Sequence, residues 1–127
     1  MPTRETHFLY PAALFASKDA VTVSTILGSC VAVCLFDKSK NIGGINHFML
    51  PLWNGQGLES PKYGNVAIRK LLQKLESLGC RKEDLVAKIF GGGEVIETGT
   101  HFQIGARNIQ TAEEELKALG IPIVARS

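Results

Sequence analysis

The sequence predicts an α/β fold of the α+β kind, with layered mixed or antiparallel β-sheets and flanking helices. Two observations carry this prediction. The first half of the chain is rich in apolar and β-branched residues, whereas the second half contains two segments whose apolar residues recur every three or four positions. A length of 127 residues, with 45% hydrophobic and 20% charged residues, is typical of one globular domain, so we expect residues 1–127 to form a single domain.

Three strands are expected in the first half of the chain. Residues 21–27 and 31–36 form continuous apolar runs, which are typical of strands buried on both faces, and the two runs are joined at 28–29. A polar turn over 37–41 precedes a third apolar run over 42–50. The last two of these strands are therefore expected to pair as a hairpin.

Two helices and two further strands are expected in the second half. After a loop over 51–61, one apolar helical face extends over 68–78 and a second over 109–119, and a glycine follows each of them. A strand at 85–90 lies between the helices, and a last strand at 121–125 follows them.

The charge balance argues against two classes of partner. Fourteen Lys and Arg residues against twelve Asp and Glu residues give a net charge of +2, without the clustered cations that a nucleic-acid backbone requires. The uncharged stretch over 20–36 is shorter than the roughly 20 apolar residues of a membrane-spanning helix. We therefore expect neither nucleic-acid binding nor membrane insertion.

The cysteines and the N-terminus predict a cytoplasmic protein. Cys30, Cys34 and Cys80 form no C-x-x-C pair, and the first residues lack the charged start and apolar run of a secretory signal. Thiols stay reduced in the cytosol. Cys34, inside an apolar run, is expected to be a small core residue.

Cys30 is the candidate reactive residue. It follows Gly28 and Ser29 at the expected turn between two strands, where its sulfur can be exposed and nearby backbone N–H groups can be free. The thiolate is the reactive form, and it needs a neighbouring base or cation to lower the thiol pKa. The competing interpretation is that Cys30 is a small buried hydrophobic residue.

His47 is the candidate base. Reflecting the expected hairpin about its turn places His47 level with the residues around Cys30. A cysteine and a histidine on facing strands can form an ion pair in which the imidazole takes the thiol proton. Gly43 and Gly44 would leave room for an approaching substrate. A hydrogen-bonded strand histidine is the alternative for His47 alone.

Metal and phosphate sites are competing hypotheses for these motifs. Cys30, Cys34 and His47 could supply three ligands, but the spacing lacks the paired cysteines of a structural zinc site. Glycines 91–93 lack the pattern of a phosphate-binding loop and are expected to let a strand end approach the neighbouring backbone. We therefore expect neither a metal nor an organic cofactor.

Two motifs resemble the CheD family of chemoreceptor glutamine deamidases: TILGSCVAV at 25–33 and GGINHFMLP at 43–51. Three further stretches agree with this family, at 61–78, 88–93 and 104–108. The resemblance implies a fold shared with the catalytic domain of cytotoxic necrotizing factor toxins. It also implies hydrolysis of glutamine side chains on the cytoplasmic helices of methyl-accepting chemotaxis proteins, and binding of the phosphatase CheC by some relatives.

The resemblance assigns Cys30 as the nucleophile, which forms a thioester with the substrate, and His47 as its base. The third member of the family's site is a threonine a few residues before the cysteine, which corresponds to either Ser24 or Thr25. Because neighbouring residues on a strand face opposite sides, only one of these two side chains can orient the imidazole.

The substrate is expected to contact Gly28, Ser29 and Gly44, and backbone N–H groups of Ser29 or Cys30 could hold the oxyanion. Family members usually continue past the last strand with a terminal hairpin, so residues 1–127 are expected to be either a short form of the domain or a fragment of it. An adaptor is the alternative function: a weakly active or inactive protein of the same fold that binds receptors or CheC.

Overall fold

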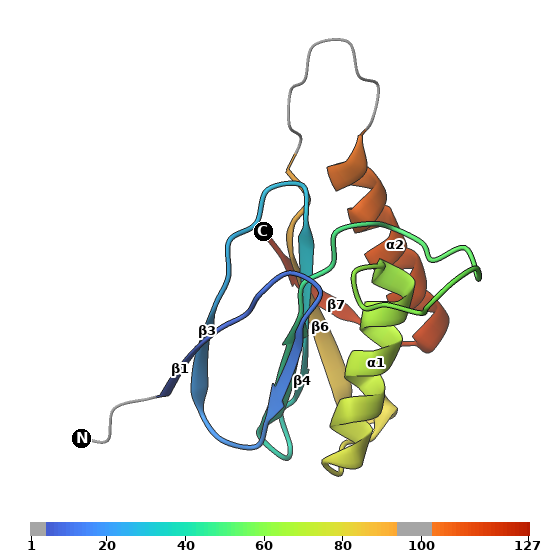
Figure 1. Cartoon of the computed structure of the whole chain (residues 1–127). Helices are drawn as coiled ribbons and strands as arrows, with labels where there is room; N and C mark the ends of the chain where they lie inside the picture. Colours follow the sequence, from blue (N-terminus) through green and yellow to red (C-terminus); the bar gives the residue numbers. More distant parts are fainter. Residues whose placement is uncertain (1–4, 94–102) are drawn as a thin grey trace.

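In the computed structural model, two β-sheets and two α-helices make up the described part of the chain, residues 5–93 and 103–127 (Figure 1). The strands are β1 (Glu5–Phe8), β2 (Leu14–Ser17), β3 (Val21–Ser24), β4 (Val31–Asp37), β5 (Ile42–Asn46), β6 (Leu85–Gly91) and β7 (Ile123–Arg126). The helices are α1 (Gly64–Ser77) and α2 (Ile104–Leu119), with a short 3-10 helix at Lys82–Asp84.

The larger sheet is mixed. Its five strands lie in the order β2-β5-β4-β6-β7, with antiparallel pairs except for β6 and β7, which are parallel. Both helices pack on one face of this sheet, and the small parallel sheet of β1 and β3 lies on the other side (Figure 1). The predicted fold class, with mixed and antiparallel sheets and flanking helices, is confirmed.

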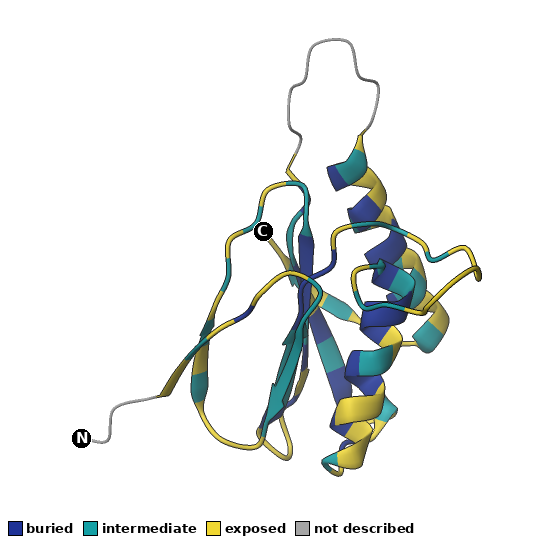
Figure 2. Cartoon of the chain, viewed as in Figure 1, coloured by how far each residue is buried: buried dark blue, intermediate teal, exposed yellow. Residues whose placement is uncertain are grey.

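The core lies between the five-stranded sheet and the two helices, where the buried residues of the ribbon concentrate (Figure 2). The central strand β4 is buried along most of its length because sheet neighbours flank it and helices cover it. The core includes Val31, Val33, Leu35, Phe48, Ile68, Leu71, Leu75, Leu85, Ile89 and Leu116. Each expected helical face thus supplies core residues.

Both predicted helices form, and each begins earlier than its apolar face, at Gly64 and at Ile104. The glycines after them have left-handed backbone conformations, with φ of +103° at Gly79 and +74° at Gly120. A glycine adopts this conformation without the steric cost that a Cβ imposes, so it allows the chain to leave a helix sharply.

The predicted hairpin of β4 and β5 is present. Its turn is held by Asp37, whose Oδ1 accepts hydrogen bonds from the Ser39 backbone N–H at 2.9 Å, the Ser39 hydroxyl at 2.7 Å and the Lys40 backbone N–H at 3.1 Å. The hydrogen bond from the Ser39 hydroxyl is the main cause that lowers the pKa of the Asp37 carboxyl. Cys34 pairs with Ile45, a register close to the one expected from the sequence.

The third strand ends earlier than predicted, at Asn46 instead of residue 50. The side-chain Oδ1 of Asn46 accepts the Val33 backbone N–H at 2.9 Å and so takes the place of a backbone carbonyl in the ladder. The pairing resumes only at the isolated bridge between Val31 and Phe48. His47 therefore lies in an irregular step between two paired segments.

The prediction for 21–27 is wrong in two respects. The strand covers only Val21–Ser24, and its residues alternate between half-buried and exposed instead of being buried on both faces. It pairs in parallel with β1. The sequence analysis predicted neither β1 nor β2. Residues 28–29 therefore connect two different sheets, because the chain crosses from the small sheet to β4 at this point.

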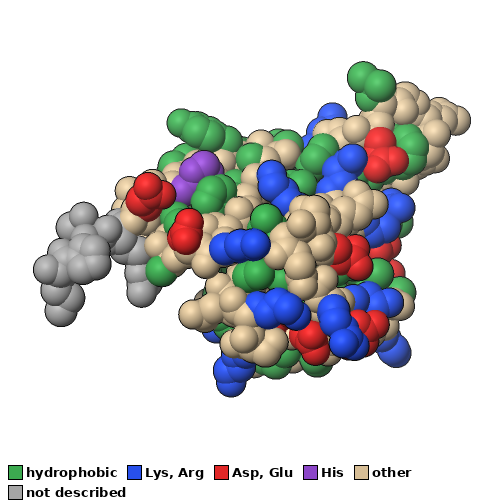
Figure 3. Space-filling view, turned by 90° about the horizontal axis from the view of Figure 1, so that it is seen from below, with side chains coloured by type: hydrophobic (Ala, Val, Ile, Leu, Met, Phe, Trp, Pro, Cys, Tyr) green, Lys and Arg blue, Asp and Glu red, His purple; other side chains and the backbone are tan. Residues whose placement is uncertain are grey.

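Surface charges of both signs are interspersed on the face drawn in Figure 3, where no large patch of one sign is visible. Neither α-helix in the described residues is long and apolar enough to cross a bilayer.

We expect Gly44→Ala to lower the free energy of unfolding by about 1–3 kcal/mol, the usual cost of overpacking a core. A Cβ at Gly44 would lie 2.7 Å from Leu71 Cδ1 of α1 and 3.0 Å from the Phe15 carbonyl oxygen. Denaturant unfolding measures the change. Gly28→Ala is the control, because a Cβ there meets nothing within 4 Å. Equal stabilities of the two variants would contradict this account of the sheet-to-helix contact.

Candidate active site

Two paired backbone segments carry the candidate nucleophile and base. Val31 and Phe48 exchange backbone hydrogen bonds of 3.0 and 2.9 Å, and Cys30 and His47 are the residues that precede them. In the register of β4 and β5, residue 47 falls opposite residue 32, and residues 30 and 32 face the same side of a strand. Extended by one residue beyond each strand end, this register would place Cys30 diagonally opposite His47 at one end of the sheet.

His47 is held by Thr25, on the segment that follows β3. Thr25 Oγ1 lies 2.7 Å from His47 Nδ1, and the same hydroxyl donates a hydrogen bond of 2.8 Å to the Leu9 carbonyl. A threonine hydroxyl has one proton, and here that proton is given to the carbonyl of Leu9. Nδ1 must therefore carry the imidazole proton and donate to Oγ1, which leaves Nε2 as the basic nitrogen of the neutral ring.

Ser24 is placed differently from Thr25. It is the last residue of β3, pairs with Phe8 in the small sheet and is exposed, while its carbonyl accepts the Leu9 backbone N–H at 2.8 Å. Of the two residues proposed to orient the imidazole, only Thr25 contacts it in the described structure. The role of this contact in catalysis stays a prediction.

No hydrogen bond joins Cys30 to His47 in the described residues, and the expected ion pair stays a prediction. Nε2 of His47 is buried and has no hydrogen-bond partner among the described residues. Burial lowers the pKa of His47. Burial also raises the pKa of Cys30, although the backbone N–H of Cys30 itself partly offsets this rise. Desolvation therefore disfavours the charged form of each side chain.

The backbone of the cysteine segment is held by the end of β6. The Gly28 carbonyl accepts the Gly93 N–H, and the Cys30 carbonyl accepts the Gly92 N–H, each at 2.8 Å. A Cβ at Gly91 would lie only 2.4 Å from the Cys30 carbonyl oxygen, so the close approach requires glycine. The expectation that glycines 91–93 let a strand end approach neighbouring backbone is confirmed.

Asn108 of α2 is a site residue that the sequence analysis missed. Its side-chain Nδ2 donates to the Ser29 carbonyl at 3.0 Å and to the Met49 carbonyl at 3.1 Å, and the residue is fully buried. Asn108 thereby joins the segment before Cys30 to the segment after His47. The sequence indicated Asn108 only as the last residue of the 104–108 stretch, which agrees with the CheD family but contains no motif that predicts a chemical role.

The predicted substrate contacts have different surroundings. Gly28 is exposed and faces open space, and the Ser29 N–H bonds no acceptor among the described residues, so both are accessible to a ligand. Gly44 packs against Leu71 of α1, and this packing alone accounts for the glycine. Substrate binding at these three positions stays a prediction.

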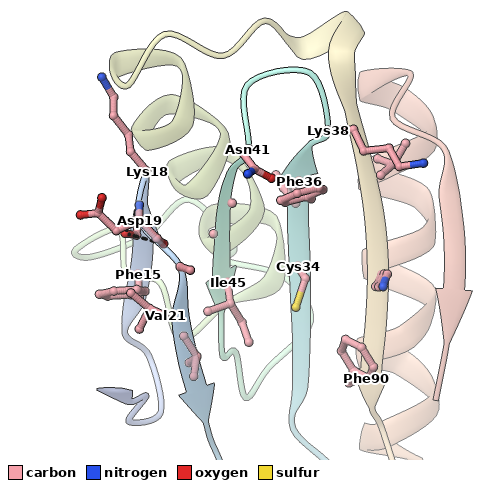
Figure 4. A pocket seen from close by; sticks show the side chains of 18 of the residues that line it. Phe15, Lys18, Asp19, Val21, Cys34, Phe36, Lys38, Asn41, Ile45 and Phe90 are labelled. Carbon is pink, nitrogen blue, oxygen red and sulfur yellow. Dashed lines mark hydrogen bonds between the residues drawn. The ribbon is translucent and has the colours of Figure 1, made fainter. Parts of the chain in front are cut away.

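Cys34 and Cys80 lie outside this arrangement. Cys34 lines a groove on the sheet face away from the helices, together with Phe36, Ile45 and Phe90 (Figure 4). Burial there raises the pKa of Cys34 to about 11. Cys80 is buried in the core. No group of three or more His, Cys, Asp or Glu side chains in the described part of the chain could hold a metal ion.

Comparison with known proteins identifies the family. The model of the family described as CheD chemotactic sensory transduction matches residues 49–127. A probable chemoreceptor glutamine deamidase CheD of Trichlorobacter lovleyi is 48% identical over 120 residues, which are 94% of this chain and 74% of that protein. The chain belongs to the CheD family.

Other relatives agree with this membership. A probable chemoreceptor glutamine deamidase CheD of Sulfurimonas denitrificans is 45% identical over 123 residues, which are 95% of this CheD-family chain and 79% of that protein. The crystal structure of the Bacillus licheniformis hypothetical protein YfiH covers 90% of this chain with a TM-score of 0.57. Its sequence identity is 15% and the match spans 49% of its length, so this likeness concerns the fold alone.

We expect alkylation of Cys30 by iodoacetamide to rise about tenfold per pH unit between pH 7 and pH 9, because the raised pKa keeps the thiolate fraction small at neutral pH. Mass spectrometry of proteolytic peptides measures the rate at each cysteine. Cys34, with a pKa of about 11, is the internal control and should react more slowly. A rate at Cys30 that is flat from pH 6 to pH 8 would instead indicate a thiolate–imidazolium pair.

Proposed function

We propose that this protein hydrolyses the side-chain amide of specific glutamines on chemoreceptors to glutamate, with release of ammonia. One observation carries the proposal: Cys30 and a buried histidine directly precede the paired residues Val31 and Phe48, and the Thr25 contact at Nδ1 leaves the histidine Nε2 without a partner among the described residues. The relatives' names, which describe probable chemoreceptor glutamine deamidases, supply the substrate class.

In the first half of the proposed reaction, Cys30 Sγ attacks the carboxamide carbon of the substrate glutamine. His47 Nε2 accepts the thiol proton during this attack, and the Nδ1–H bond to Thr25 stabilises the resulting imidazolium. Catalytic hydrogen bonds often tighten only in the substrate complex, which agrees with the absence of a Cys30–His47 bond in the resting site. Backbone N–H groups of Ser29 and Cys30 hold the oxyanion.

In the second half, the imidazolium returns the proton to the amide nitrogen, and the C–N bond breaks to give ammonia and a thioester at Cys30. Neutral His47 then takes a proton from water, whose oxygen attacks the thioester carbonyl. The C–S bond breaks, glutamate leaves, and the thiol regains its proton. Every proton is carried by His47 or exchanged with water, and no redox change occurs.

The proposed partners are the cytoplasmic helices of chemoreceptors, with CheC as a regulatory partner. The relatives' names support the receptor, and the family resemblance alone supports CheC. We place the reaction in the cytoplasm, where these receptor helices lie.

Conversion of amide to carboxylate on a purified chemoreceptor cytoplasmic fragment tests this proposal. We expect the wild-type protein to release ammonia and to increase the mass of the fragment by the difference between an amide and a carboxylic acid at each modified glutamine. Cys30→Ala should lose this activity completely because it removes the nucleophile. Cys34→Ala is the matched control and should keep most of it, because Cys34 lies in the groove of Figure 4. A wild-type protein that binds the fragment without modifying it would favour the adaptor.

We expect Thr25→Val to lower kcat for deamidation by about 10- to 100-fold, because the imidazole loses the acceptor that fixes its tautomer. This loss is smaller than that of His47→Ala, since the base itself remains. Ser24→Ala is the neighbouring control and should keep wild-type kcat and melting temperature. Full activity of both Thr25→Val and Ser24→Ala would remove the threonine side chain from the mechanism.

A further inference from the structure

We propose that Asn108 is a positioning residue for this reaction: its amide holds the Ser29–Cys30 peptide so that the Cys30 N–H faces the developing oxyanion. The inference rests on the proposed function, because an oxyanion forms only if Cys30 attacks a carbonyl carbon. Asn108 acts through the backbone of the cysteine segment.

The orientation of the Asn108 amide is set by its partners. Both groups that it contacts, the Ser29 and Met49 carbonyls, are acceptors, so Nδ2 and not Oδ1 must face them. Oδ1 lies on the other side, buried and without a hydrogen-bond partner among the described residues. An apolar residue at this position would leave both carbonyls without this donor, so the asparagine side chain both satisfies the two carbonyls and fixes their direction.

The contact to Ser29 decides which way the next N–H points. In a trans peptide the C=O and N–H groups are antiparallel, so fixing the Ser29 carbonyl toward α2 turns the Cys30 N–H in the opposite direction. The Gly93 and Gly92 bonds fix the carbonyls of Gly28 and Cys30 in the same way. The N–H groups of Ser29 and Cys30 bond no other residue in the described part of the chain, and the Cys30 N–H faces the thiol of its own residue, beside the position where the oxyanion would form.

The contact to Met49 gives the Asn108 side chain a second fixed point, so that it can hold the Ser29 carbonyl in place. The Met49 N–H donates to the Lys62 carbonyl at 2.8 Å, so its backbone is tied to the segment before α1. Asn108, anchored on α2, therefore bridges two segments that are each fixed elsewhere. Movement of the cysteine segment away from the histidine segment would break at least one of these bonds.

The test separates steps that form an oxyanion from steps that do not. Deamidation of the receptor fragment passes through a tetrahedral oxyanion, whereas alkylation of Cys30 by iodoacetamide is a displacement at a saturated carbon. Loss of one oxyanion donor typically costs about 10²–10³ in kcat. We expect Asn108→Leu, which is close in size and has no donor, to lower kcat by about 10- to 100-fold, with KM and Cys30 alkylation within about twofold of wild type.

Thr111→Val is the control, because Thr111 is buried one turn further along α2 and, in the described residues, no hydrogen bond joins it to Ser29 or Met49. It should keep wild-type kcat, and melting temperatures of all variants are measured alongside. Asn108→Ala repeats the test with a smaller side chain. If both Asn108 variants fail to fold, Asn108 serves stability and the proposal is overturned.

Two other results would also overturn it: unchanged kcat in Asn108→Leu, or equal losses in kcat and in Cys30 alkylation, which would indicate displacement of the nucleophile itself. Failure of the proposed function can be distinguished from failure of the Asn108 proposal, because in the first case the wild-type protein itself would release no ammonia from the fragment. A wild-type protein that deamidates while Asn108→Leu matches it in kcat would refute only the role of Asn108.

Discussion

The backbone pairing of Val31 with Phe48 is the interaction on which the candidate site depends. β4 begins at this pair and β5 has already ended at Asn46, so two reciprocal hydrogen bonds alone join the strands here. Both side chains are fully buried, which fixes the pair against the helices. Because Cys30 and His47 directly precede these two residues, their relative position is set by backbone geometry and core packing, which are more rigid than a surface loop.

Burial also shifts the pKa values of the site. It raises the pKa of Cys30 and lowers that of His47, so it disfavours both the thiolate and the imidazolium. The tautomer needed for this transfer is set by Thr25, whose own proton is committed to the Leu9 carbonyl. The small β1–β3 sheet thus positions the base, because Thr25 directly follows β3 and Leu9, whose carbonyl accepts the threonine proton, directly follows β1.

The sequence by itself determined the secondary structure in the second half of the chain and the β4–β5 hairpin. These features depend on local patterns: apolar periodicity, glycines after helices, and a polar turn between two apolar runs. Hairpin register is a local property as well, which is why reflection about the turn placed His47 within one residue of its position in the structure.

Only the tertiary structure decided the partner of the histidine, the sheet to which β3 belongs, and the part played by α2. The choice between Ser24 and Thr25 depends on where the small sheet lies, and the contact of Asn108 with Ser29 joins residues 79 positions apart. Desolvation, which raises the pKa of Cys30 and lowers that of His47, likewise depends on what surrounds the two side chains in the folded protein. A sequence pattern reports periodicity and local bonding, whereas these contacts arise when distant segments pack together.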